Sequence, residues 1–582
     1  MMTKESSRSS EKYALRVEFE QFGKPNGLNW FTTTLFIVAD MAGGGVVAMP
    51  IAMLQSGGIA GAIIIAILCV AFCYTAHLLS ENWTIMCERW SVYKEHCRKP
   101  YPEMAYRAMG SNARSFCSST LNVMLFGVSV VYLLLSSHII NDFVSSIIGH
   151  SIGFCYTLLV VAVILWPITL LKSPQDFWWA IVVAMLTTLF SVILILVGTS
   201  IDYSICNAAS YTPPFHIKSL LLSLGTFMFG YGGHAVFPTI QHDMKNPKHF
   251  TQSAIVAFCI VTAMYAPISM LGYATYGDSL EESIINSIQT EWIQRGANLF
   301  IAMHCILTLT IVINPLNQEV EQLFDVPHHF GWHRFILRTT VMMAVVFTAE
   351  SVPKFGPILN VIGGTTVALT SAILPTLYNL YLKASTIDPT TKKYKRPTII
   401  EVIERTPKLR LIINFFVIVL AIVFGIATTH TAIVEMASTH FTMPCYLAYF
   451  GNPAHNLAAE SPKENRAMQI LVDEDNIVEK WYIQAPLLLI LLEVLTICVI
   501  RSILAYMGIV KYRHKRDECY KAPILDSSYF AGGPTYLERK KRHHETNHII
   551  NAELDRWRSQ EFLWNKGREH YNEQNLTYCQ QD

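Results

Sequence analysis

Apolar stretches of about 20 residues recur along most of this 582-residue chain, and no other feature restricts its fold so strongly. A helix of that length crosses the roughly 30 Å hydrocarbon core of a bilayer. Only 15% of the residues are charged, whereas a soluble domain carries about a quarter to cover its surface. We therefore predict an all-α integral membrane protein that crosses the bilayer many times. The twelve predicted spans lie at residues 30–54, 59–86, 116–145, 153–172, 177–199, 219–241, 253–276, 293–318, 334–352, 356–382, 409–431 and 483–507.

Basic residues orient these spans. With the N-terminus inside, 38 of the 44 Lys and Arg residues fall on the inner side, as the positive-inside rule requires. This predicts a cytosolic tail at 1–29, a ten-span core at 30–382, an inner loop with peripheral spans 11 and 12 and a long outer loop at 383–510, and a cytosolic tail at 511–582. Both termini are expected in the cytoplasm, and the polar first 29 residues do not form a cleavable signal peptide.

Spans 1 and 6 each contain a glycine cluster followed by a proline at membrane depth, within residues 40–50 and 229–238. Glycine destabilises a helix by about 1 kcal/mol relative to alanine, and proline removes a backbone hydrogen bond, so both helices are predicted to break. Unpaired backbone groups are tolerated in a bilayer only where they line protein or a water-filled cavity, so two such breaks imply a shared cavity. Aligning the prolines pairs Pro50 with Pro238, Gly44 with Gly232 and Gly45 with Gly233.

An offset of five spans inverts the second unit relative to the first, which predicts a ten-span 5+5 inverted-repeat core of the kind found in secondary transporters. The N–H groups that open the second half of span 1 can bind a carboxylate, and the carbonyls that end the first half of span 6 can bind an ammonium. An amino acid carries both groups. The predicted substrate-binding residues are Gly43, Gly44, Gly45, Val46, Phe229, Gly230, Tyr231, Gly232 and His234.

Other interpretations of these residues stay open. Glycine clusters also allow helices to pack closely, although two clusters in matching register favour a site. His234 lies beside the second break, where it either contacts substrate or is a hydrogen-bonded structural residue.

Asp40 in span 1 and Thr308 in span 8 are the predicted ligands of a coupling ion, either a proton or sodium. A carboxylate in the middle of a span is costly and by default indicates an ion path or a cationic substrate. The alternative for Asp40 is a carboxylate satisfied by neighbouring helices. Thr308 and the nearby Thr310 can equally bond their own backbone, as threonines in membrane helices often do.

Several motifs resemble those of the amino acid/auxin permease family, which belongs to the amino acid, polyamine and organocation superfamily. The resemblance extends in order over residues 30–435 and implies a ten-span core that moves amino acids together with protons or sodium. The chain departs from the family pattern in its outer loop at about 432–482, its extra apolar run, its long tail and the aspartate at position 40. The motifs are Gly43-x-Gly45 with Pro50, Tyr101-Pro102-Glu103 through Gly110, Phe229 to Pro238 continuing through Asn246-Pro247, Gly272 to Asp278, and Asn314-Pro315 with Glu319 and Glu321.

The sequence thus predicts a secondary active amino acid transporter that works by alternating access. The alternative is an amino-acid-sensing receptor without net transport. The long C-terminal tail is the only sequence feature that supports it. An enzyme is not expected, because the one catalytic pattern, His544-Glu545-Thr546-Asn547-His548, lies in a charged tail without a domain around it. No cofactor, no metal site and, with a net charge of +1, no nucleic-acid partner are predicted.

Cysteines and sequons give further expectations about sidedness. Cys206 and Cys445 are the clearest cysteines of the outer loops, where oxidising surroundings would allow a disulfide between them, although their separation in sequence says nothing about their distance in space. The sequons at Asn82 and Asn575 fall on the inner side and should not be glycosylated. The lipid bilayer and an amino acid are the expected partners, whereas the sequence does not distinguish plasma membrane from endolysosomal membrane or indicate an oligomeric state.

Overall fold

The computed structural model describes residues 27–438 and Cys445, apart from short gaps at 95–96, 98, 151, 171–177, 325, 327–330 and 390–393. Contacts divide the chain into two compact units, residues 1–515 and 516–582, and all described residues belong to the first unit. The predicted span 12, most of both tails and of the outer loop, the motif at 544–548 and the sequon at Asn575 lie outside the described residues.

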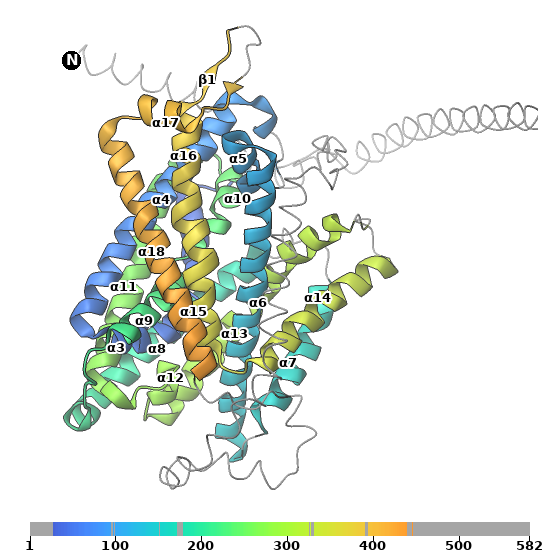
Figure 1. The fold of residues 1–582 in the computed structure, drawn as a ribbon. Helices are drawn as coiled ribbons and strands as arrows, with labels where there is room; N and C mark the ends of the chain where they lie inside the picture. Colours follow the sequence, from blue (N-terminus) through green and yellow to red (C-terminus); the bar gives the residue numbers. More distant parts are fainter. Residues whose placement is uncertain are drawn as a thin grey trace, which may run out of the picture. The chain divides into compact units, whose positions relative to one another are not determined.

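The described chain is almost entirely helical (Figure 1). Two short strands, β1 (Thr386–Ile387) and β2 (Tyr394–Lys395), pair antiparallel. The long helices are α2 (Trp30–Met41), α3 (Gly44–Ser56), α4 (Gly58–Arg89), α6 (Ser111–Ile148), α7 (Phe154–Thr169), α8 (Trp178–Cys206), α9 (Ile217–Gly230), α11 (Phe250–Tyr276), α13 (Glu291–Leu323), α14 (Trp332–Ser351), α16 (Leu374–Ala384) and α18 (Lys408–Ser438). Shorter helices are α5 (Pro100–Met109), α10 (Phe237–His242), α12 (Ile284–Ser287), α15 (Phe355–Ile362), α17 (Ile399–Arg405), the π-helix η7 (Gly363–Ile373), and the 3-10 turns η1 (Ser91–Tyr93), η3 (Asn207–Ala209), η4 (Gly233–Ala235), η5 (Pro247–His249) and η6 (Gly277–Ser279).

Each of the eleven predicted spans between residues 30 and 431 coincides with one of these helices or with a run of them. By length and composition, eight helical segments in the described part of the chain can cross a membrane, and the bent pair α2 and α3 makes a ninth. Two predicted spans do not meet that test. Helix α7 is apolar but has only 16 residues, and α14 carries Arg334 and Arg338.

The arginines of α14 are neutralised by a carboxylate of α13. Glu321 Oε1 accepts hydrogen bonds from Arg334 Nε at 2.9 Å and from Arg338 Nε at 2.6 Å, and all three side chains are buried. Arg338 Nη1 also donates to the carbonyl of Thr169 at the end of α7, at 2.9 Å. Because charges inside a bundle are tolerated when they are paired and hydrogen-bonded, this cluster lets α14 pack among apolar helices.

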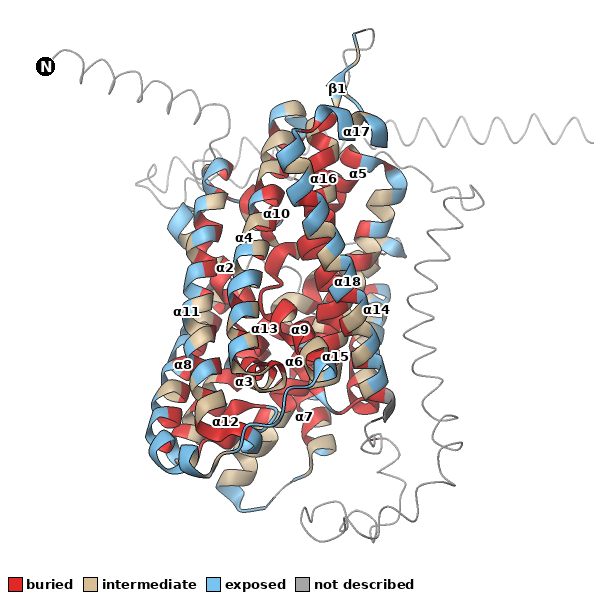
Figure 2. Ribbon diagram, turned by 60° about the vertical axis from the view of Figure 1, so that its left-hand side comes forward, coloured by how far each residue is buried: buried red, intermediate tan, exposed pale blue. Residues whose placement is uncertain are grey.

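Large apolar side chains are exposed on the outside of the bundle, where lipid would surround them. Figure 2 shows which stretches of the helices are exposed and which are buried. On α4, for example, Ile59, Ile63, Ile67 and Val70 are all exposed, whereas many small hydroxyl side chains are buried together with the apolar core. Exposed apolar side chains in this number agree with the membrane protein that the composition predicted.

Hydrogen bonds and ion pairs join α5 to η7, the residue before α5 to α13, and α16 to α4. The Tyr101 hydroxyl of α5 donates to the carbonyl of Thr370 in η7 at 2.5 Å, and Lys99 pairs with Glu319 of α13 at 2.6 Å. Lys383 of α16 pairs with Glu81 of α4. Three residues of the family motifs, Tyr101, Glu103 and Glu319, thus take part in bonds at this end of the bundle, since Glu103 also accepts from Arg114 at 2.8 Å.

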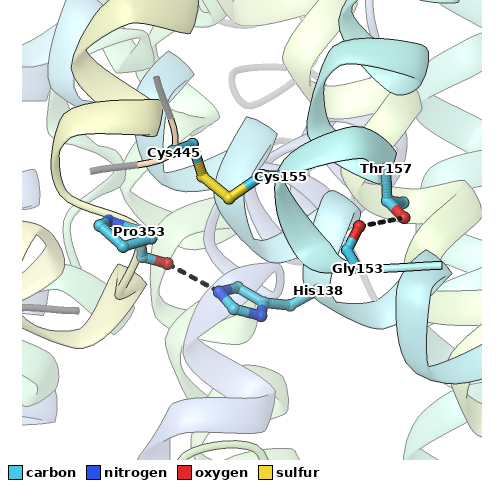
Figure 3. Close-up of a disulfide and its surroundings, with 6 residues drawn as sticks. All are labelled: His138, Gly153, Cys155, Thr157, Pro353 and Cys445. Atoms are coloured by element: carbon cyan, nitrogen blue, oxygen red, sulfur yellow. Dashed lines mark hydrogen bonds between the residues drawn. A yellow bond between two sulfur atoms is a disulfide. The ribbon is translucent and has the colours of Figure 1, made fainter. Parts of the chain in front are cut away.

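The disulfide between Cys206 and Cys445, which their positions in the outer loops would allow, is not formed. Cys445 is bonded instead to Cys155, with the two Cα atoms 5.4 Å apart, and Cys206 is a free cysteine at the end of α8 (Figure 3). Cys155 falls within the predicted span 153–172, so it was not counted among the cysteines of the outer loops. However, α7 begins at Phe154, so Cys155 lies in its first turn and not in its interior.

A stacked histidine lies next to this disulfide. The His138 ring of α6 stacks on Phe154 with ring centroids 3.9 Å apart, and its Nε2 lies 2.7 Å from the carbonyl oxygen of Pro353, just before α15 (Figure 3). Helices α6, α7 and α15 are therefore tied together at this end, and the disulfide adds Cys445 to them.

Glycines bring α9, η7 and α18 into backbone contact. A Cβ atom at Gly363 would collide with the carbonyl oxygen of Gly225 and lie 2.8 Å from its carbonyl carbon. A Cβ atom at Gly425 would lie 2.8 Å from the carbonyl oxygen of Gly364. Small residues at such crossings are how helices approach one another in lipid. The close-packing interpretation of glycine therefore applies here, in a different place from the two breaks.

Cysteine substitutions test the disulfide. Cys445→Ser should leave Cys155 as a thiol that reacts with maleimide in the denatured, unreduced protein, because its only bonded sulfur has been removed. Cys206→Ser is the matched control and should leave the peptide that joins Cys155 to Cys445 intact in non-reducing mass spectrometry. A wild-type peptide that joins Cys206 to Cys445 would contradict the structure.

The glycine crossing is tested by a pair of alanine substitutions. Gly363→Ala should lower the melting temperature of the purified protein, because about 1–3 kcal/mol of overpacking outweighs the gain of about 1 kcal/mol in helix propensity. Gly356→Ala in α15 meets no heavy atom within 4 Å and should leave the melting temperature unchanged or slightly raised. Equal effects of the two substitutions would argue against the crossing.

Candidate substrate site

Both predicted helix breaks are present. Helix α2 ends at Met41, α3 begins at Gly44, and the two are bent by 57°. Helix α9 ends at Gly230, and the chain passes through the short turn η4 before α10 begins at Phe237. The two breaks meet, because a Cβ atom at Gly45 would lie 3.0 Å from the Cα atom of Gly230.

Contacts between the breaks leave no room for a ligand at that point. A Cβ atom at Gly230 would collide with the methyl group of Met49, and one at Gly44 would lie 3.4 Å from Leu135 of α6. Gly232 is close to Val367 of η7, at 2.6 Å from its added Cβ atom to Val367 Cγ1. In this conformation an amino acid cannot lie directly between Gly45 and Gly230.

The carbonyl groups freed at the two breaks face a tyrosine of α11. Tyr265 Oη lies 2.7 Å from the carbonyl oxygen of Met41 and 3.1 Å from that of Gly230. The carbonyl oxygen of Phe229 accepts from Gly232 N at 3.0 Å, which turns the chain at the end of α9. The freed acceptors of both breaks are thus satisfied within the protein, as their depth in a bilayer requires.

On the other side of the first break, Gly43 faces α6 and α13. A Cβ atom there would collide with the Tyr132 hydroxyl and lie 2.7 Å from His304 Nε2. His304 is fully buried, and its Nδ1 lies 3.1 Å from the carbonyl oxygen of Ala184 and 2.7 Å from Thr188 Oγ1, both on α8. Because a carbonyl only accepts, this bond places the ring proton on Nδ1 and leaves Nε2 as an acceptor directed at the break.

The predicted coupling residues do not share a partner. Thr308 Oγ1 lies 3.2 Å from His304 Nε2, so its hydroxyl has a protein partner. Asp40 is half-buried, and a Cβ atom at Gly233 would lie 2.5 Å from its Oδ2 atom. In the described part of the chain, its carboxylate has no hydrogen bond or ion pair. A carboxylate of span 1 therefore faces the break of span 6 without a partner.

The side chains of His234 and Tyr231 have partners on α4 and α11. His234 Nε2 lies 3.0 Å from both Thr75 Oγ1 and the carbonyl oxygen of Phe72 on α4, and the ring contacts that of Phe237. The Tyr231 hydroxyl lies 2.8 Å from Thr262 Oγ1 of α11. These contacts are those of the structural alternative for His234. Val46 is fully buried in α3, and Phe229 is half-buried with its ring 4.0 Å from the Cβ position of Gly44.

Sequence reasoning missed four residues that the structure brings to the breaks. For His304 a signal was available, since an ionisable residue inside an apolar run is unusual. Nothing in the sequence distinguishes the other three from similar residues in other spans. The four are Tyr132, Thr188, Tyr265 and His304. Among the described residues, no group of three or more His, Cys, Asp or Glu side chains is placed to hold a metal ion.

The sequence pattern that defines the family described as transmembrane amino acid transporter protein matches residues 26–430, which include both breaks and every residue of the site. The chain belongs to this family. The predicted resemblance is therefore confirmed, and because the family is one of transporters, the protein is not an enzyme.

Similar proteins of known class are plant transporters. Amino acid transporter AVT1J of Arabidopsis thaliana is 25% identical over 62% of this chain and 84% of its own length. Amino acid transporter ANT1 and Lysine histidine transporter-like 4 of the same plant are 23% and 24% identical, over 68% and 61% of this chain and 90% and 81% of their own lengths. The crystal structure of MhsT in complex with L-phenylalanine is 9% identical over 70% of this chain and all of its own, and its TM-score of 0.48 is too low to bear on the fold.

Adjacent glycines test the geometry of the first break. Gly43→Ala should lower the melting temperature of the purified protein markedly, because the new methyl group meets the Tyr132 hydroxyl and His304 Nε2. Gly44→Ala should cost much less, since its nearest neighbour lies at 3.4 Å, an ordinary contact distance. Combining Gly43→Ala with Tyr132→Phe should recover part of the loss. Strictly additive losses would mean that the two residues do not touch.

Proposed function

We propose that this protein is a secondary active transporter that moves amino acids across a membrane by alternating access, coupled to protons or sodium. The observation that carries the proposal is the meeting of the two helix breaks at Gly45 and Gly230, beside the half-buried carboxylate of Asp40, which has no hydrogen bond or ion pair among the described residues. Membership of the transporter family supports it. The ten-span 5+5 inverted repeat over residues 30–382 is part of this proposal.

In the proposed mechanism, the substrate uses the groups that the breaks free. The N–H groups at Gly44, Gly45 and Val46 open helix α3 and attract the α-carboxylate. The carbonyls at Phe229 and Gly230 end α9 and attract the α-ammonium. Since Gly45 and Gly230 are in contact here, binding requires the two breaks to separate, which is the kind of change that alternating access provides.

Asp40 is the proposed coupling residue. Its carboxylate faces Gly233 at the second break, while Asp40 itself lies in α2 next to the first break. A change at either break therefore changes the surroundings of this carboxylate. A proton or sodium ion bound there would lower the cost of a carboxylate at this depth and would favour one conformation over the other. Thr308 is the second proposed ligand, and the His304 ring next to it is its present partner. A cationic substrate is the alternative partner of Asp40. Three similar plant proteins carry the name lysine histidine transporter-like.

The proposed orientation places both termini in the cytoplasm, with the protein in the plasma membrane or an endolysosomal membrane. The excess of basic residues on the inner side supports it. The disulfide is independent support, because Cys155 lies at the end of α7 that this orientation places outside, where oxidising conditions are found. The amino acid receptor is the less favoured alternative, since the relatives are transporters.

Uptake by purified protein in liposomes tests the function. A labelled panel of amino acids that includes alanine, lysine and histidine is offered with a pH gradient or a sodium gradient imposed separately. We expect accumulation driven by one of the two gradients. Binding without accumulation would favour the receptor.

The same assay tests the coupling residue. Asp40→Asn should remove the dependence on the driving gradient and reduce uptake at least tenfold, since it cannot bind the cation. Asp278→Asn is the matched control, because that carboxylate lies in the turn after α11, where it accepts from Tyr211 N at 3.2 Å. An Asp40→Asn protein with unchanged gradient dependence would exclude the coupling role.

A further inference from the structure

The hydroxyl group of Tyr265 occupies an unusual position at the junction of the two breaks. It is fully buried in α11 and lies within hydrogen-bond distance of two main-chain carbonyls, those of Met41 and Gly230. Met41 is the last residue of α2 and Gly230 is the last residue of α9. The same oxygen would lie 2.7 Å from a Cβ atom at Gly45, so it also touches the start of α3.

The two carbonyls at this junction share the Tyr265 hydroxyl, and that of Met41 also accepts from Gly43 N at 2.9 Å. A tyrosine hydroxyl has one proton, and each carbonyl oxygen is an acceptor only, so one of the two carbonyls lacks a full hydrogen bond from it at any time. Both carbonyls lie at helix C-termini, where the aligned peptide dipoles give a partial negative charge. A group with several N–H donors and a positive charge satisfies this junction better than a neutral hydroxyl does.

We propose that Tyr265 is a positioning residue whose hydroxyl takes the place of the substrate ammonium in the closed, empty conformation. When an amino acid binds, the hydroxyl moves away and the ammonium donates to the carbonyls of Met41 and Gly230 in its place. The inference rests on the proposed transport function and adds to it a residue of α11 and a second carbonyl, that of Met41. The ligand it implies is a primary ammonium with at least two free N–H groups.

This role predicts an effect on affinity opposite to that of a supporting residue. The hydroxyl stabilises the empty conformation, because it bonds the two breaks to each other. Substrate binding must give up these bonds before the breaks separate. Removing the hydroxyl leaves the buried carbonyl of Gly230 without its donor in the empty protein, while that of Met41 keeps the hydrogen bond from Gly43 N at 2.9 Å. An added ammonium can then donate to both carbonyls.

Tyr265→Phe tests the proposal. In purified protein, binding of the amino acid that most stabilises the wild type in a panel of the twenty standard L-amino acids should tighten roughly two- to tenfold, the range that one hydrogen bond gives. The empty variant should melt at a lower temperature than the wild type, and the amino acid should raise its melting temperature by more. In liposomes KM and kcat should both fall, because the bound amino acid is released more slowly.

Tyr101→Phe is the matched control. Tyr101 is also buried, and its hydroxyl also donates to a main-chain carbonyl, that of Thr370, outside the junction. This variant should lose stability without any gain in affinity. Weaker or unchanged binding by Tyr265→Phe, relative to Tyr101→Phe, would overturn the proposal.

A spectroscopic measurement does not depend on how well the variant folds. With 3-fluorotyrosine incorporated at position 265, the ¹⁹F resonance should shift when the amino acid is added, whereas fluorotyrosine at position 101 should not respond. A saturated protein with an unmoved resonance at position 265 would also overturn the proposal. If the wild-type protein neither binds nor transports any amino acid of the panel, the transport function itself has failed. If it does both and only the Tyr265 results are negative, the failure is confined to this inference.

Discussion

A main-chain group inside a bilayer must find a hydrogen-bond partner within the protein, and the arrangement of this bundle follows from that requirement. The glycine clusters of spans 1 and 6 interrupt two helices where water is scarce. The interruptions are tolerable because they face each other and because side chains of surrounding helices reach them. Tyr265 of α11 approaches the carbonyls of Met41 and Gly230, while Tyr132 of α6 and His304 of α13 close over Gly43. The positions of the helices around the breaks thus depend on main-chain hydrogen bonding as much as on side-chain packing.

The sequence predicted the helices and the breaks well, because both depend on local properties. Hydropathy located helices at all eleven predicted positions between residues 30 and 431, of which eight or nine can cross a membrane by length and composition, and the glycines and prolines located both interruptions. What it could not supply was the direction of side chains and the distance between segments. His234 lies beside the break, but its ring is within hydrogen-bond distance of α4, which the sequence alone did not indicate. Cys155 was not considered as the partner of Cys445 because it falls within the predicted span 153–172. Only the start of α7 at Phe154 shows that Cys155 lies at the end of that helix.

Two further features show how the bundle accommodates residues that a membrane disfavours. The paired arginines of α14 lie on one glutamate of α13, and the glycines of α9, η7 and α18 bring backbones into contact. The arginines lie 13 and 17 residues from Glu321, on the next helix of the chain, whereas the glycine contacts join segments that lie far apart in the sequence. The ion pairs let α14 pack beside α13 with two arginines in it, and the glycines let the backbones of α9, η7 and α18 approach one another.

The disulfide between Cys155 and Cys445 encloses 290 residues of sequence, from the start of α7 to the segment beyond α18. Those residues form a covalent ring that contains the second break, the tyrosine of α11 and the hairpin of β1 and β2. A single cut of the main chain anywhere in the ring would open it without releasing a fragment. A cut between α16 and α17 would therefore leave α18 covalently attached to the rest of the bundle through the disulfide.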